Sequence, residues 1–250
     1  MNRREMIKNA GIVGLGTLLS SSIINGKNYD VKKDGKLKVI VAGAHPDDPE
    51  LSCGGTIKLL TNAGHEVVIY YLTKGQIGIK GKTPEQTSTI RKKEAKAACK
   101  ILGAKPFFGK QFDGSTEINN KRFNEVLEFV EKEQPDIVFT HWPIDTHPDH
   151  RACSNLFYNA WLKSGKPFNL FYFEVSTGNE TQMFNPSVYV EINSVLEDKH
   201  KACFAHESQN VKQWYAEIHG VIEKFRGMNL YSKYGEAFVQ QLPHDSGFIK

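Results

Sequence analysis

Two short clusters of histidine and aspartate residues carry the chemistry that this sequence can support. The first cluster, residues 44–50, has the sequence A-H-P-D-D-P-E. The second, residues 145–151, has the sequence D-T-H-P-D-H-R and places two His residues three apart, on one side of a helical turn. Catalytic zinc sites use three His or carboxylate ligands and keep one position open for water. The two clusters together supply such a set, with a carboxylate and a His left over for proton transfer and charge stabilisation.

Each cluster directly follows a segment that is predicted to be a strand. Residues 36–44 form a nearly continuous apolar run rich in Val and Ile, which is typical of a buried parallel strand. Residues 136–141 predict another. In an open α/β sheet, ligands bind beyond the carboxyl ends of the strands, so both clusters lie where function is expected. The alternative for the first cluster alone is an ordinary polar loop with a solvated acidic patch.

The remaining sequence alternates between strand and helix patterns. Further strands are expected at residues 66–73, 106–108, 169–175 and 187–192, and helices at residues 56–63, 84–102, 121–133, 150–162, 195–206 and 211–226. This rhythm indicates βαβ units, and hence a Rossmann-like α/β fold with a mostly parallel β-sheet flanked by helices. Because no internal repeat or linker interrupts it, we expect a single domain over residues 36–250.

The first 26 residues have the sequence pattern of an export signal and are not expected to belong to the folded domain. A basic start that contains Arg3 and Arg4 precedes a short apolar run at residues 9–24, which resembles a bacterial twin-arginine signal. An uncleaved anchor or an amphipathic helix is the alternative, but the run is shorter than the ~20 residues that a spanning helix needs. We therefore expect an exported, periplasmic protein with no stable membrane span after signal removal.

Charge and cysteine usage exclude other classes of protein. The chain of 250 residues has a net charge of only +4 and no dense Lys/Arg patch, which argues against nucleic acid as a partner. Its four cysteines, Cys53, Cys99, Cys153 and Cys203, include no C-x-x-C pair. They are expected to be buried free thiols rather than zinc ligands.

The paired motifs resemble those of the LmbE-like or PIG-L family of zinc-dependent N-deacetylases. The similarity rests on A-H-P-D-D-x-E at residues 44–50, C-G-G-T at 53–56 and H-P-D-H at 147–150. Further similar positions extend it over roughly residues 36–240. Two departures lie near the expected pocket: Gln76 replaces the usual acidic residue after L-T-x-G, and Asp145 stands where some members have Tyr.

The resemblance implies a role for individual residues. The zinc ligands would be His45, Asp48 and His150. Asp47 would be the general base for the attacking water. His147 would stabilise the oxyanion or protonate the leaving amine, with Asp149 orienting it, and Arg91 would contact the substrate.

The implied activity is removal of an N-acetyl group from an N-acetylglucosamine-type sugar or glycoconjugate, with one Zn²⁺, or another divalent metal, per chain. Two alternatives remain open: an amidase of the same family acting on a thiol conjugate or another acyl amine, and a non-catalytic carbohydrate-binding descendant. The second is disfavoured because the three ligands and Asp47 are all present.

Overall fold

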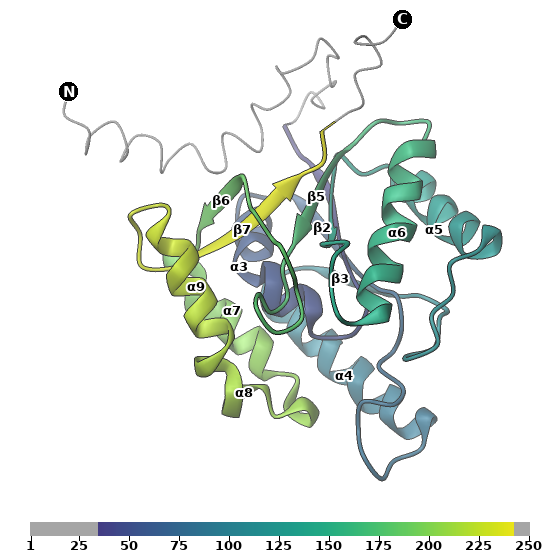
Figure 1. Ribbon diagram of the computed structural model, residues 1–250, viewed down its shortest axis with the longest axis horizontal. Helices are drawn as coiled ribbons and strands as arrows, with labels where there is room; N and C mark the ends of the chain where they lie inside the picture. The colour runs from purple at the N-terminus through teal and green to yellow at the C-terminus, as the bar shows by residue number, and fades with distance from the viewer. Residues whose placement is uncertain (1–34, 243–250) are drawn as a thin grey trace, which may run out of the picture.

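The computed structural model describes residues 35–242, which share one seven-stranded sheet with helices on both faces (Figure 1). The strands, in chain order, are β1 (Lys38–Gly43), β2 (Glu66–Tyr71), β3 (Lys105–Phe108), β4 (Ile137–His141), β5 (Asn169–Phe173), β6 (Val188–Glu191) and β7 (Gly235–Gln240). The predicted Rossmann-like α/β fold is confirmed. The export signal expected in residues 1–26 lies outside the described residues.

The order of the strands creates a switch point between β1 and β4. The sheet order is β3-β2-β1-β4-β5-β7-β6, and β1 pairs in parallel with β2 on one side and with β4 on the other. The chain therefore leaves β1 in one direction and returns to β4 on its opposite side, so the loops after these two strands diverge and leave room for a ligand. In the described sheet, β7 is the one strand that runs opposite to the others, and it pairs antiparallel with β5 and β6.

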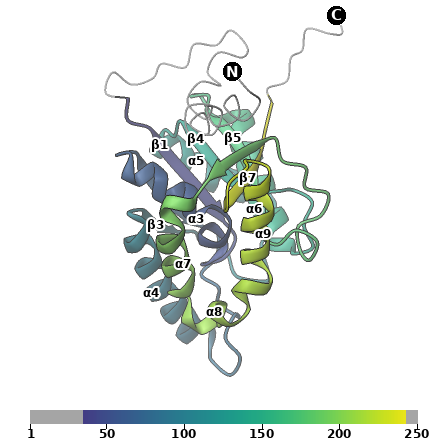
Figure 2. The same cartoon turned by 90° about the vertical axis from the view of Figure 1, so that its left-hand side faces the viewer.

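Helices cover both faces of the sheet, which explains the continuous apolar runs in its central strands. The α-helices of the described residues are α3 (Asp48–Asn62), α4 (Pro84–Leu102), α5 (Asn120–Glu133), α6 (Pro148–Lys163), α7 (Leu196–Phe204), the short α8 (Val211–Trp214) and α9 (His219–Met228). On one face α3, α4 and α7 pack together, and on the other α5 and α6 (Figure 2). Val39 and Val41 face the first group, whereas Ile40 and Ala42 face the second.

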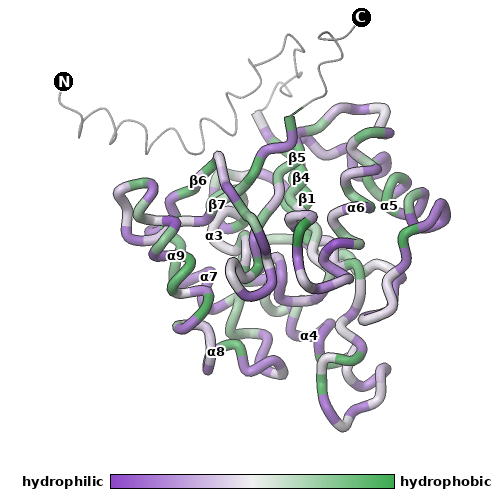
Figure 3. Tube along the Cα trace, viewed as in Figure 1, coloured by the Kyte–Doolittle hydropathy of each residue, from purple (hydrophilic) through white to green (hydrophobic). Residues whose placement is uncertain are grey.

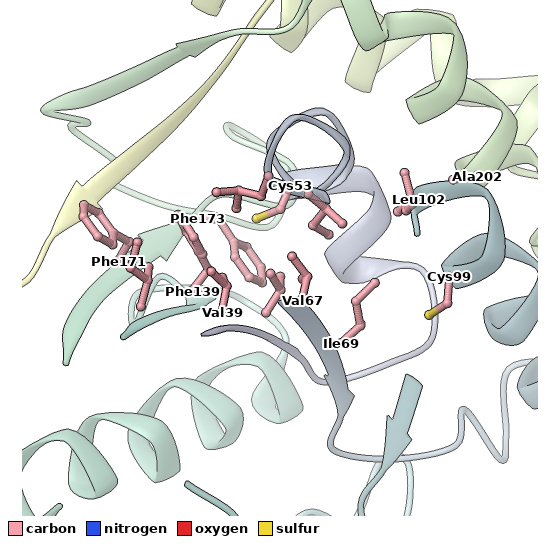
Figure 4. Close-up of a cluster of buried hydrophobic side chains, with 14 of the residues drawn as sticks. Val39, Cys53, Val67, Ile69, Cys99, Leu102, Phe139, Phe171, Phe173 and Ala202 are labelled. Atoms are coloured by element: carbon pink, nitrogen blue, oxygen red, sulfur yellow. The ribbon is translucent and has the colours of Figure 1, made fainter. Parts of the chain in front are cut away.

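The hydrophobic core follows from this alternation. Apolar residues follow the strands through the middle of the molecule, and polar residues mark the outer turns (Figure 3). On the α3 side, Val39, Ile69 and Phe139 from three neighbouring strands pack against Cys53 and Cys99 from the helices (Figure 4). All four cysteines are buried and free, as predicted. Among the described helices, none combines the length and apolar character needed to cross a bilayer.

Three elements differ from the sequence-based expectation. Helix α3 begins at Asp48, eight residues before the expected start, because Pro49 is tolerated in the first helical turn. The expected helix over residues 211–226 is broken at Ile218, where φ is −115° and ψ is −80°, into α8, a short 3₁₀ turn and α9. Strand β7 was not expected.

The glycine pair of the C-G-G-T motif allows neighbouring elements to approach α3 closely. A Cβ on Gly54 would lie 2.8 Å from Cγ of Lys199, and one on Gly55 would lie 2.5 Å from Cγ2 of Ile192. Glu236 of β7 accepts hydrogen bonds from the N–H groups of Gly55 and Thr56, and Nζ of Lys199 lies 2.7 Å from it. The buried pair formed by Lys199 and Glu236 therefore fixes the helix that begins with Asp48.

We expect Gly55→Ala to lower the free energy of unfolding by about 1–3 kcal/mol, because the added methyl group overpacks against Ile192. Denaturant unfolding measures the change. Gly220→Ala, in the first turn of α9, is the matched control, since its Cβ would make only an ordinary contact of 3.5 Å with the carbonyl oxygen of Tyr215 and should be neutral or stabilising. Equal stability of the two variants would contradict the packing argument.

Candidate metal centre and active-site cleft

A cleft of about 450 Å³ opens beyond the carboxyl ends of β1 and β4. Both sequence clusters contribute to its lining, which includes His45, Asp47, Asp48, His147 and His150. The two clusters are about 100 residues apart in sequence, yet the ring centroids of His45 and His150 lie only 5.4 Å apart. The sheet thus brings the predicted ligands to one place.

The carboxylate of Asp48 lies between two imidazole rings. Its Oδ2 is 3.3 Å from Nδ1 of His45, and its Oδ1 is 3.5 Å from Nε2 of His150. A tetrahedral zinc site with bonds of about 2.0–2.1 Å separates its ligand atoms by about 3.3–3.4 Å. Each imidazole thus has the spacing of a zinc ligand to one oxygen of Asp48, although the two rings approach different oxygens, and the donor chemistry suits a divalent metal ion.

Further carboxylates hold the opposite nitrogen of each ring. Nε2 of His45 lies 3.2 Å from Asp113 and 3.1 Å from Asp149, while Nδ1 of His150 lies 3.1 Å from Asp145. Metal-binding His residues commonly donate their second N–H to a carboxylate in this way, which fixes the tautomer and the orientation of the ring. The remaining nitrogens, Nδ1 of His45 and Nε2 of His150, are the ones that lie near Asp48.

Other combinations of donors overlap this set. Three groups of three side chains have donor atoms within 4.8 Å of one another among residues 35–242: His45 with His147 and His150, Asp48 with His141 and His150, and His45 with Asp113 and Asp149. Every group contains His45 or His150. None of the groups is the predicted set of His45, Asp48 and His150, so the structure indicates the place of a metal more firmly than the identity of its ligands, and that assignment stays a prediction.

The electrostatic field at this place favours positive charge. Burial alone would lower the pKa of His150, but Asp48 and Asp145 raise it to about 9. Burial would also lower the pKa of His45. The carboxylates of Asp48, Asp113 and Asp149 outweigh burial and hold the pKa of His45 well above its ordinary value. A field that stabilises an imidazolium ion also stabilises a metal cation, which displaces the proton when it binds.

Asp47 lies beside the ligands in a strained backbone conformation. Its φ of +118° is rare for a residue with a side chain, and such strain concentrates at functional sites. Burial raises the pKa of its carboxyl, while Arg91, whose Nη2 lies 2.8 Å from Oδ2, opposes that rise. Asp47 lines the cleft without belonging to any of the three donor groups.

Arg91 is held tightly in the cleft wall. It is 4% exposed, and its guanidinium donates both to Asp47 and to the backbone carbonyl of Pro46. A Cβ on Gly75 or on Gly78 would lie within 2.7 Å of its side chain, so the two glycines leave the space that it occupies. The observed partners make Arg91 the residue that orients Asp47, and its substrate contact stays a prediction.

The expected partnership between Asp149 and His147 takes a different form. The carboxylate of Asp149 contacts His45, the N–H of Gly114 and the hydroxyl of Thr116, and not the ring of His147. Only the backbone N–H of Asp149 contacts that ring, donating to Nδ1 at 3.2 Å. The reason is that His147 caps helix α6, so its ring turns back toward the first helical N–H groups.

Sequence reasoning missed the supporting role of three buried residues. Asp145 was noted only as a departure from the family, and Asp113 was assigned no role. His141, at the end of β4, does not line the cleft; its ring stacks on His150 at 4.2 Å, and its Nε2 accepts the N–H of Ala44. The position of Asp145 two residues before the H-P-D-H motif was the signal that could have found it.

Comparison with known proteins places the chain in a family. Residues 40–161 match the family model PIG-L, described as GlcNAc-PI de-N-acetylase. The diacetylchitobiose deacetylase of Thermococcus kodakarensis is 34% identical over 202 residues, which cover 74% of this chain and 73% of that protein. A probable N-acetyl-α-D-glucosaminyl L-malate deacetylase of Bacillus cereus is 31% identical over 182 residues, which cover 68% of this chain and 83% of that protein.

A solved structure agrees with these sequence relatives. The conserved protein TT1542 from Thermus thermophilus is 32% identical, with a TM-score of 0.71, and the match covers 83% of this chain and 96% of that one. The fold, the motifs and the relatives together define the class of protein as a deacetylase. The chain belongs to the PIG-L family, as its motifs predicted.

We expect Asp145→Asn to weaken the affinity for a divalent metal by about 10–100-fold, because an amide holds the ring of His150 less firmly than a carboxylate does. Competition with a chromophoric chelator measures the affinity. Asp198→Asn, at an exposed carboxylate on α7, is the control and should bind metal like the unaltered protein. Unchanged affinity in Asp145→Asn would remove Asp145 from the metal centre.

Proposed function

We propose that the chain is a zinc-dependent hydrolase that removes the acetyl group from an N-acetylglucosamine-type sugar or glycoconjugate. The observation that carries this proposal is the carboxylate of Asp48 between His45 and His150, with Asp47 beside it on the cleft wall. The donor set of two imidazoles and one carboxylate suits zinc. The sequence relatives, whose names describe deacetylases of N-acetylated sugars, support the choice of substrate class.

The reaction breaks one C–N bond and consumes one water molecule. Water oxygen attacks the acetyl carbonyl carbon, the amide C–N bond breaks, and the products are acetate and the free amine of the sugar. A divalent metal at His45, Asp48 and His150 would polarise the carbonyl and make water more acidic. The protein must then accept a proton from the water and deliver one to the leaving nitrogen.

Asp47 suits the first of these tasks. Its carboxylate faces the cleft, and Arg91 fixes its orientation. Burial raises the pKa of Asp47, and a more basic carboxylate accepts a proton more readily. We assign Asp47 as the general base, which can later hand the same proton to the amine.

His147 suits stabilisation of the negative charge that develops on the carbonyl oxygen. Because its Nδ1 accepts the N–H of Asp149, the neutral ring carries its proton on Nε2. Burial, together with His45 and His150, lowers the pKa of His147, which keeps the ring neutral. A neutral N–H donor favours the oxyanion role over protonation of the amine.

The proposal includes the compartment. The paired arginines and the short apolar run of residues 1–26 support export through a twin-arginine-type signal to the periplasm. Cell fractionation of the full-length chain, compared with an Arg3→Lys/Arg4→Lys double variant, tests it. Retention of both proteins in the cytoplasm would remove this part of the proposal.

We expect Asp47→Asn to lower kcat/KM for an N-acetylated sugar by about 10²–10⁴-fold, because the amide cannot accept the proton. Metal content should stay near one zinc per chain, measured by elemental analysis. Treatment with a chelator should abolish amine release by the unaltered protein, and added zinc should restore it.

The control for this substitution is Asp136→Asn, which lies just before β4 at the end of the strands opposite the cleft, where its carboxylate accepts the N–H of Lys38. It should keep full activity. Loss of zinc in Asp47→Asn would make Asp47 a ligand and overturn its assignment as the base.

A further inference from the structure

The cleft extends from the candidate metal centre to a second group of residues on the C-terminal helices. Trp214 of α8, Ile218 in the break between the helices and His219 at the start of α9 line this part of the cleft, together with Ser176 and Asn179 of the loop after β5. The indole N–H of Trp214 donates to the carbonyl of Gln209 at 3.1 Å, which fixes its ring. None of these residues belongs to the sequence motifs that define the family.

Two polar side chains in this region make no hydrogen bond among the described residues. His219 is 4% exposed, and within residues 35–242 its ring makes ring contacts with Trp214 and Tyr215 but no hydrogen bond or ion pair. Ser176 is also 4% exposed, and its Oγ has no hydrogen-bond partner there. Buried polar groups are nearly always satisfied, so the unpaired Oγ of Ser176, with the ring of His219 free to form a hydrogen bond on the same cleft wall, indicates a ligand that completes them.

Apart from the carboxyl of Glu180, the polar groups beside these residues are neutral hydrogen-bonding groups. Arg91 is the sole Lys or Arg that lines the cleft within the described part of the chain, and its guanidinium is paired with Asp47. Burial, with Lys199 beyond it, lowers the pKa of His219 to about 3, so the ring is uncharged at neutral pH. No cation there would compensate a carboxylate or phosphate on the bound molecule, and burying such a group unpaired is costly.

The mixture of an aromatic ring with a few uncharged polar groups is suited to a sugar ring. Sugars present hydroxyl groups at their edge and C–H groups on their face, and a pocket that combines apolar walls with a few fixed hydrogen-bonding groups matches both. Cavities of about 300–1,000 Å³ hold small-molecule ligands, so 450 Å³ leaves room beyond the single ring whose acetyl group reacts.

We propose that His219, Ser176 and Trp214 form a subsite for a second, uncharged sugar unit, so that the substrate is a neutral N-acetylated disaccharide or longer saccharide rather than an anionic conjugate. The inference rests on the proposed deacetylase function and specifies its substrate. The break at Ile218 is what brings both α8 and the first residue of α9 to the cleft.

The first test compares three substrates with the zinc-loaded full-length protein: N-acetylglucosamine, N,N′-diacetylchitobiose and N-acetyl-α-D-glucosaminyl L-malate. Release of amine gives kcat/KM for each. We expect the neutral disaccharide to exceed both others by about tenfold or more, the effect of roughly one well-placed hydrogen bond to a buried group. Equal values for the disaccharide and the monosaccharide, or a preference for the malate conjugate, would overturn the proposal.

The second test changes the subsite. His219→Ala should lower the ratio of kcat/KM for disaccharide to that for monosaccharide about tenfold, and His219→Gln, which keeps a neutral hydrogen-bonding group, should restore most of it. The same ratio is measured for Trp214→Phe and for the control Trp161→Phe. The indole of Trp161 on α6 also donates to a backbone carbonyl, but this residue lies outside the cleft lining. An unchanged ratio in folded His219→Ala, checked by circular dichroism, would contradict the subsite.

A binding measurement separates failure of the subsite from failure of the proposed function. Calorimetric titration of zinc-loaded Asp47→Asn with diacetylchitobiose should give a Kd that rises about tenfold when His219→Ala is added. If the unaltered protein releases no amine from any of the three sugars, the deacetylase proposal fails, yet this titration still decides the subsite. Absence of disaccharide binding, or binding insensitive to His219, would overturn it.

Discussion

The carboxylate of Asp48 between the rings of His45 and His150 is the interaction on which the site depends. It requires β1 and β4 to be neighbours, because one ring follows each strand, and it requires helix α3 to begin at the residue that supplies the carboxylate. Desolvation of these charged and polar groups is unfavourable unless each has a partner. Asp113, Asp145 and Asp149 provide those partners for the two rings.

The same constraint explains why so much buried charge surrounds the cleft. An acidic cluster of this density would repel itself without a cation, so the protein surrounds it with imidazoles and with Arg91. Strain at Asp47 is part of this arrangement: the backbone at φ +118° turns its side chain toward the cleft while the next residue starts the helix. The two adjacent aspartates can then have different roles: Asp48 points toward the two His rings, and Asp47 points toward Arg91 and the cleft.

Much of the fold and the place of the site could be predicted from the sequence. Strands β1 and β4 were visible because helices bury them on both faces, which requires unbroken apolar runs. Helix α4 was predicted with its observed bounds, since Pro84 and Gly103 mark its ends. Strand β7 was not predicted because Gly235 and Glu236 are unusual in a strand. The break at Ile218 was not predicted because the apolar spacing of residues 211–226 continues through it. The partners of the His rings depend on tertiary contacts that no local pattern records.

The hydrogen bonds between Glu236 and the backbone of α3 bear on how the protein matures. Asp48 is near the beginning of the described chain, whereas Glu236, which holds the α3 backbone at Gly55 and Thr56, lies in its last strand. A chain growing on the ribosome exposes the helix long before the residue that secures it, and N-terminal parts begin to fold first. Metal-binding competence should therefore arise late in biosynthesis, when the antiparallel strand inserts between β5 and β6, which limits premature capture of metal by nascent chains.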